Sequence, residues 1–249
     1  MVRYTYLDTM EDKAFSSIDF VGQCLQDEEK AVAFEKVLKK IIQPNYRVLD
    51  IGTGSGILAL FAARAGAKDV IALEYDPFIA EIARKNFKNN NYGSTIQIVT
   101  ADAREVAFPK GTTFDVVIME MLTSGMVDEF QVQATNNLHR KGYIGPSTIF
   151  VPRKQETYLT LVNVDYTLHG LKMEMILHAW RNFRDLRNYK CSEPTQLNTV
   201  DFSNFVNEHF EATISVRVTR EGIVNAIWLS SKAYIDNKTI LENTISLNP

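Results

Sequence analysis

The segment Val48-Leu49-Asp50-Ile51-Gly52-Thr53-Gly54-Ser55-Gly56-Ile57 decides the fold of this chain of 249 residues. A short, mostly apolar run leads into three glycines at alternate positions, and an alanine-rich run over 57–65 follows them. The apolar run predicts a buried strand, and the alanine-rich run predicts a helix. Glycines between them allow a tight turn and let a ligand approach the backbone. Strand, glycine turn and helix in this order are typical of a nucleoside-binding site at the edge of a parallel sheet.

The same alternation of strands and helices continues downstream. Apolar runs predict strands over 70–73, 96–99 and 114–119. Periodic segments predict helices over 78–89 and 127–139. Asp76 and Pro77 mark the start of one helix as its N-cap and first helical residue. Strands that are apolar on both faces indicate a sheet covered on both sides. The expected fold class is therefore α/β, a doubly wound, Rossmann-like parallel sheet.

Different patterns flank this central region on both sides. An amphipathic segment over 29–42 predicts a helix before it. Glycines and prolines over 142–152 end the alternation, and the segments 157–164, 212–218 and 224–234 predict antiparallel strands. We therefore expect an N-terminal helical cap over 1–43, a Rossmann-like domain over 44–150, and a smaller antiparallel, barrel-like β domain over 151–249.

Composition excludes several classes of function. With 45% hydrophobic residues and a net charge of −3, the chain suits a globular protein whose affinity does not rest on phosphate contacts. No apolar run approaches the ~20 residues of a membrane span, and residues 1–13 carry no secretory apolar region. Neither the two cysteines nor the four histidines show metal-ligand spacing. We expect a cytoplasmic protein without a membrane anchor or a metal.

The ligand of the glycine turn can be chosen from its neighbouring residues. A dinucleotide fingerprint needs a third glycine at position 57, which is Ile57. Asp50 would repel a pyrophosphate, whereas it suits the cationic ammonium of an amino-acid sulfonium. Glu74, eighteen residues after Gly56, ends the second predicted strand and can accept hydrogen bonds from both ribose hydroxyls. These residues favour S-adenosylmethionine, with S-adenosylhomocysteine as its product.

The D-x-G-x-G-x-G pattern with its downstream acid resembles class I S-adenosylmethionine-dependent methyltransferases. Residues 25–164 further resemble the protein arginine N-methyltransferase family, through the segments 25–30, 54–74, 119–122 and 145–152. The resemblance implies that Asp102 lies near the adenine and that Lys30 replaces the family arginine that pairs with the donor carboxylate. The expected donor-binding residues are Lys30, Asp50, Gly52, Gly54, Glu74 and Asp102.

Glu120 and Glu129 match the family's two glutamates, nine residues apart. A guanidinium has a pKa of about 12.5–13.8, so it arrives protonated and is a poor nucleophile. Two carboxylates can hold it through forked hydrogen bonds and draw its charge away from one nitrogen. The resemblance therefore implies that Glu120 and Glu129 are catalytic and that one of them takes the released proton, directly or through water.

Several positions depart from the family, and they leave the methyl acceptor open. Lysine for arginine at position 30 loses the bidentate fork. The other departures are Cys24 for a methionine, Arg104 for an acid near the adenine, Thr123-Ser124-Gly125 for bulkier residues, and no His-Trp loop before the chain ends at Pro249.

Three functions stay open on the sequence alone. The first is N-methylation of a guanidino or amino group on a protein or a small compound. The second is an RNA methylase that uses the basic residues Arg181, Arg184, Arg187 and Lys190. The third is a cofactor-binding scaffold without catalysis. The family commonly forms head-to-tail dimers, so a homodimer through an arm within 167–189 is one expected assembly.

Overall fold

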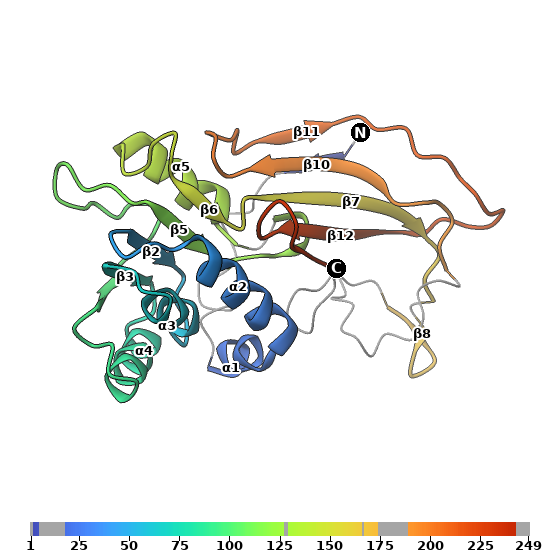
Figure 1. The fold of residues 1–249 in the computed structure, drawn as a ribbon. Coiled ribbons are helices and arrows are strands. Elements are labelled where there is room, and N and C mark those ends of the chain that lie inside the picture. The colour runs from blue at the N-terminus through green and yellow to red at the C-terminus, as the bar shows by residue number, and fades with distance from the viewer. Residues whose placement is uncertain (1, 5–17, 127–128, 166, 174–188, 243–249) are drawn as a thin grey trace.

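The computed structural model describes residues 2–4, 18–126, 129–165, 167–173 and 189–242. Two sheets dominate it, one parallel and surrounded by helices, the other antiparallel and formed by the second half of the chain (Figure 1).

The parallel sheet has five strands in the order β4-β3-β2-β5-β6. Its strands are β2 (Arg47–Ile51), β3 (Asp69–Glu74), β4 (Ile96–Thr100), β5 (Val116–Met119) and β6 (Ile149–Val151). Strand order reverses direction beside β2, so the carboxyl ends of β2 and β5 frame a crevice where ligands bind in such sheets. The predicted doubly wound α/β sheet is confirmed.

Helices cover both faces of this sheet. α2 (Glu28–Ile41), α3 (Ile57–Arg64) and α4 (Pro77–Asn89) bury apolar side chains against one face. α5 (Gln131–Lys141) packs on the other face through Val132, Ala134 and Leu138. The short helix α1 (Ile18–Gln26) precedes α2 and buries none of its residues.

The start of α4 agrees with the sequence prediction, whereas the start of α5 does not. Asp76 Oδ1 accepts hydrogen bonds from the N–H groups of Phe78 (2.7 Å) and Ile79 (3.1 Å), so the predicted N-cap is confirmed. The helix predicted from residue 127 begins instead at Gln131. The 3₁₀ turn η1 (Ser124–Met126) precedes it, with Gly125 and Met126 at positive φ, and residues 129–130 are not helical.

The antiparallel sheet has the strand order β10-β7-β12-β13. It consists of β7 (Lys154–Val162), β10 (Thr195–Asp201), β12 (Ala226–Tyr234) and β13 (Ile240–Leu241), so the antiparallel β region is confirmed. The chain passes from the parallel to the antiparallel sheet between Val151 and Lys154.

Small pairings complete the described structure and correct one prediction. β11 (Phe210–Ala212) pairs with β1 (Val2–Tyr4), and β8 (Thr167–Leu168) pairs with β9 (Leu171–Lys172). The strand predicted over 212–218 is wrong beyond Ala212, because within the described residues only an isolated bridge at Val218 pairs any of this segment.

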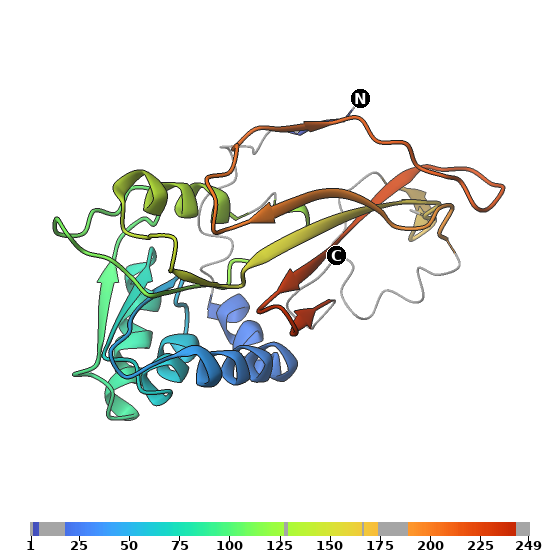
Figure 2. The same cartoon turned by 45° about the horizontal axis from the view of Figure 1, so that its top comes forward.

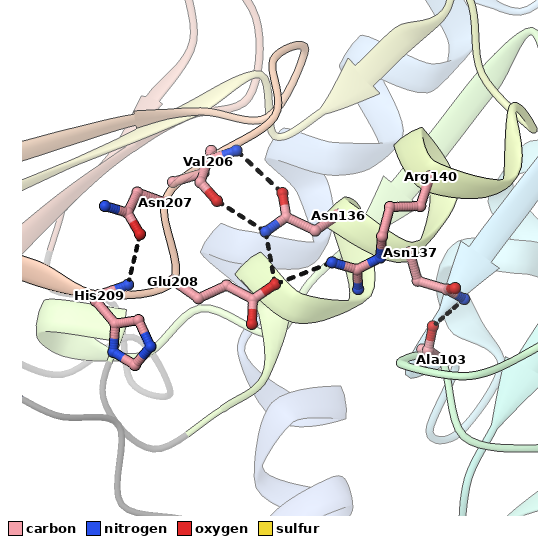
Figure 3. Close-up of polar contacts among 8 residues, drawn as sticks. All are labelled: Ala103, Asn136, Asn137, Arg140, Val206, Asn207, Glu208 and His209. Carbon is pink, nitrogen blue, oxygen red and sulfur yellow. Dashed lines mark hydrogen bonds and ion pairs between the residues drawn. The ribbon is translucent and has the colours of Figure 1, made fainter.

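Helix α5 joins the two sheets, because it contacts the segment that follows β10 (Figures 2 and 3). The Asn136 amide donates to Val206 O (2.8 Å) and accepts from Val206 N (3.0 Å), in the manner of a paired β-strand residue. The same amide nitrogen donates to Glu208 Oε1 at 2.9 Å. On the other side of the helix, Asn137 donates to the carbonyl of Ala103 at 3.0 Å. α5 thus links the loop after β4 to the antiparallel sheet.

Of the described helices, none has the length and apolar character that a membrane crossing requires.

Candidate active site

The glycine turn between β2 and α3 needs glycine at three positions for its backbone conformation, and at two of them a side chain would also meet close neighbours. Gly52, Gly54 and Gly56 have φ values of +67°, +52° and +85°, which favour glycine. A Cβ on Gly52 would lie 3.1 Å from Met121 Cγ, in the loop after β5. A Cβ on Gly56 would overlap the buried Phe87 ring, with Cζ only 2.8 Å away. Gly52 therefore makes room for the loop after β5, Gly54 is required by its backbone conformation, and Gly56 makes room for the core.

Glu74 ends β3 and fastens the same turn. Its Oε2 accepts from Gly54 N (2.9 Å) and its Oε1 accepts from Asp76 N (3.0 Å). Burial raises the pKa of this carboxyl, although the backbone hydrogen bonds from Asp76, Gly54 and Tyr75 oppose that effect. Each carboxylate oxygen has a second lone pair. With the Tyr75 backbone N–H as a third donor, Glu74 is held in place and keeps part of its acceptor capacity.

Asp50 is buried on β2, with 1% of its surface exposed. Burial raises its pKa to about 7, against the stabilising hydrogen bond from Thr53 Oγ1 at 2.5 Å. The negative charges of Glu74 and Glu120 raise this pKa further. The ends of β2, β3 and β5 therefore bring three acids close enough to influence one another, which suits a cationic ligand.

Glu120 lies beside the glycine turn because Ile51 and Met119 are register partners in β2 and β5. Its Oε2 is 2.7 Å from Lys30 Nζ, and the side chains of Glu120 and Lys30 are 17% and 5% exposed. Burial lowers the pKa of Lys30, but the charges of Glu120, Cys24 and Asp27 outweigh it, and the pKa is raised. Lys30, predicted at the donor carboxylate, thus contacts the acid predicted at the methyl acceptor.

The other two predicted acids lie in different settings. Glu129 is partly exposed in the bend before α5. Asp102 follows β4 and accepts from Arg104 Nε (3.0 and 2.9 Å), Nη2 (2.6 Å) and the backbone N–H (2.8 Å). Partial burial raises the pKa of Asp102, but these contacts outweigh it and the pKa is lowered. Arg104, which departs from the family pattern, here neutralises Asp102.

Two buried glutamines hold the loop that carries Glu120, and sequence reasoning missed both. Gln131 Nε2 donates to Met119 O at 3.0 Å. Gln155 Nε2 donates to Thr123 O at 2.8 Å and to Ser231 Oγ at 3.1 Å. Within the described residues, the Oε1 atoms of both glutamines have no hydrogen-bond partner. Nothing in the sequence separates these glutamines from surface ones, because their role depends on contacts between distant segments.

Three other sequence expectations cannot be placed. Arg181, Arg184 and Arg187 of the basic segment, most of the segment 167–189, and the chain end at 243–249 lie outside the described residues.

The sheet order, the glycine turn and the acid at the end of β3 define a class I methyltransferase fold. The family model described as ribosomal protein L11 methyltransferase (PrmA) matches residues 32–178. This is more than half of the chain, which therefore belongs to this methyltransferase family and is an S-adenosylmethionine-dependent methyltransferase.

The relatives of this chain include named methyltransferases, and solved structures share its fold. The protein MJ1452 of Methanocaldococcus jannaschii is 30% identical over 227 residues, 90% of this chain and 81% of that protein. Protein arginine N-methyltransferase 1 of Dictyostelium discoideum is 32% identical over 69% of this chain and 49% of its own length. The ribosomal protein L11 methyltransferase of Carboxydothermus hydrogenoformans is 31% identical over 53% of this chain and 42% of its own length. This chain therefore spans about half, or less, of these two methyltransferases.

A Trypanosoma brucei PRMT1 enzyme-prozyme complex with AdoHcy has the same fold, with a TM-score of 0.71 and 17% identity over 95% of this chain and 80% of that chain. Arabidopsis thaliana protein arginine methyltransferase 10 is similar, with a TM-score of 0.69 and 17% identity over 94% of this chain and 78% of that chain.

Proposed function

We propose that this methyltransferase modifies a guanidino or amino nitrogen, which Glu120 and Glu129 hold against the donor. The position of Glu120 carries this proposal. It is an acid at the carboxyl end of β5, beside the glycine turn through the register of Ile51 with Met119. An acid next to the donor site and largely shielded from water favours a cationic acceptor.

The donor fits the residues of the crevice. Under this proposal Glu74 accepts from the ribose hydroxyls, Asp50 faces the donor ammonium, and Lys30 faces the donor carboxylate. Gly52 and Gly54 keep the crevice open, because side chains there would fill it or strain the turn. Asp102 is assigned to the adenine end.

The chain's own residues then bind and orient the acceptor. S-adenosylmethionine, when bound, supplies an electrophilic methyl group. Glu120 and Glu129 fix the direction of the acceptor nitrogen by hydrogen bonds and stabilise positive charge on it. The new N–C bond forms as the C–S bond breaks and its electron pair stays on sulfur. The nitrogen releases a proton to one of the two carboxylates or to water.

The names of the relatives and the chemistry of the two glutamates support two acceptor classes. One group of relatives is named for arginine N-methylation, and the matching family model is named for a ribosomal protein. A pair of glutamates can hold a guanidinium or an ammonium, so an amino group is the second candidate.

A labelling experiment separates the acceptors. The protein is incubated with donor carrying a labelled methyl group and, in parallel, with free arginine, an arginine-rich peptide, its lysine-for-arginine counterpart, and RNA. We expect label on nitrogen of one of the first three acceptors. Label in RNA alone contradicts the acceptor assignment, and S-adenosylhomocysteine binding without transfer to any acceptor or to cell extract supports a scaffold.

Glutamine variants test the two acids. Glu120→Gln and Glu129→Gln each lower the transfer rate under this proposal, by about 100-fold or more for a lost acid–base group. Glu81→Gln changes an exposed acid on α4 and keeps the rate. Transfer at the wild-type rate by the double variant of Glu120 and Glu129 removes both from the catalytic role.

A further inference from the structure

Lys30 depends on a carboxylate to compensate its charge. It is buried in the first turn of α2, where the positive end of the helix dipole disfavours a cation. Its ammonium lies 2.7 Å from Glu120 Oε2. With only 5% of its side chain exposed, water offers little solvation. Separating such a pair leaves an uncompensated charge unless another anion takes its place.

The other acids of the site have partners of their own. Asp50 accepts from Thr53, and Glu74 accepts from the backbone of Gly54 and Asp76. Asp27 also favours the charged form of Lys30, but its carboxylate accepts from the backbone N–H of Lys30 at 3.2 Å. Glu120 is therefore the acid that the Lys30 ammonium contacts directly, and it is also the acid assigned to the cationic acceptor. An acceptor entering the site alone would compete with Lys30 for Glu120.

The donor brings one carboxylate into this arrangement. A lysine ammonium has three donors but only one unit of charge on a single nitrogen, so two carboxylates sharing it would leave one negative charge uncompensated. We infer that Lys30 exchanges partners: it holds Glu120 before the donor binds and pairs with the donor carboxylate afterwards, which frees Glu120 for the acceptor. This inference rests on the proposed function, and it makes Lys30 a positioning residue that couples the two sites.

Two consequences follow from the exchange. The donor binds before the acceptor, because only the donor supplies the replacement carboxylate. The coupling is also reciprocal. The free energy lost when the Lys30–Glu120 ion pair separates is subtracted from the free energy of donor binding. Removing the charge of Glu120 therefore strengthens donor binding, although Glu120 makes no contact with the donor in this scheme.

Binding measurements test the exchange without a known acceptor. Isothermal titration with S-adenosylhomocysteine compares the wild type, Glu120→Gln, Lys30→Met and the double variant. This ligand has an uncharged thioether, so losing Glu120 does not alter an attraction to a sulfonium. Methylthioadenosine, which lacks the amino-acid end, is the control ligand, and Glu81→Gln is the control variant. Thermal unfolding checks that each variant is folded, and Glu120→Ala, which also removes the charge, serves if Glu120→Gln does not fold.

We expect Glu120→Gln to bind S-adenosylhomocysteine about tenfold more tightly than the wild type, within the range usual for coupled sites. The gain disappears in the Lys30→Met background and with methylthioadenosine. An unchanged or weaker affinity of Glu120→Gln, or the same gain with and without Lys30, overturns the exchange while leaving the proposed function intact. A wild type that does not bind S-adenosylhomocysteine overturns both.

Discussion

The structure allows an estimate of how much the replacement of Gly56 by alanine destabilises the fold. The φ of +85° at Gly56 lies in the left-handed region, where an L-residue costs about 1–2 kcal/mol. A Cβ there would also overlap the Phe87 ring, which is 1% exposed and packed in the core. Overpacking of a core typically costs about 1–3 kcal/mol more. Gly56→Ala should therefore lower the free energy of unfolding by about 2–5 kcal/mol.

Gly66 provides the matched control for this prediction. It has a φ of +98°, but a Cβ there would meet no atom within 4 Å. Gly66→Ala should thus cost only the conformational part, about 1–2 kcal/mol. Urea unfolding of both variants isolates the steric part as the difference between them.

A double variant tests whether the steric cost of Gly56→Ala comes from the Phe87 ring. Phe87→Leu, combined with Gly56→Ala, should be less destabilised than the sum of the two single variants, because the shorter side chain relieves the overlap. The reasoning is refuted if Gly56→Ala costs no more than Gly66→Ala, or if the double variant is simply additive.

Three further predictions concern the site and its supports. Asp50 has a raised pKa of about 7 and must be ionised to attract the donor ammonium. The affinity for S-adenosylhomocysteine should therefore fall by about tenfold per pH unit below 7. Titrations from pH 6 to 8 check this, and Asp50→Asn should remove the pH dependence. Gln155→Leu removes the hydrogen bonds to Thr123 O and Ser231 Oγ, so it should cost about 1–3 kcal/mol in urea unfolding and lower kcat while S-adenosylhomocysteine affinity is kept. Asn136→Ala breaks the paired contact with Val206 and should cost a similar 1–3 kcal/mol in the same assay, and no loss of stability would contradict its linking role.

The parallel sheet could be predicted because its information is local. β2, β3 and β5 are apolar on both faces, and the N-cap Asp76 precedes a proline at the first helical position. The start of α5 could not be predicted in this way. The buried contact of Gln131 with Met119 and the turn at Gly125 determine it, and neither leaves a periodic signal. The polar strand β10 was missed for the same reason, since its pairing with β7 comes from distant residues.

In the candidate site, too, the features that are local in the sequence could be predicted and the long-range contacts could not. The glycine turn and Glu74 are close to each other along the chain and carry a recognisable spacing. The contact between Lys30 and Glu120 joins residues 90 positions apart, on α2 and after β5. The resemblance gave each residue a separate role, and only the packing of α2 beside the sheet shows that they meet. The domain bounds and the site assignments remain predictions, and the experiments above test the site assignments.

The most direct test of the donor site is isothermal titration of S-adenosylhomocysteine into the wild type and into Glu74→Gln. The wild type should bind one equivalent. Glu74→Gln should bind at least about tenfold more weakly, because a hydrogen bond to a charged group contributes about 1.5–3 kcal/mol. Glu81→Gln should match the wild type. Equal binding by Glu74→Gln, or tight binding of NADH in place of S-adenosylhomocysteine, would contradict a donor site at the ends of β2 and β3.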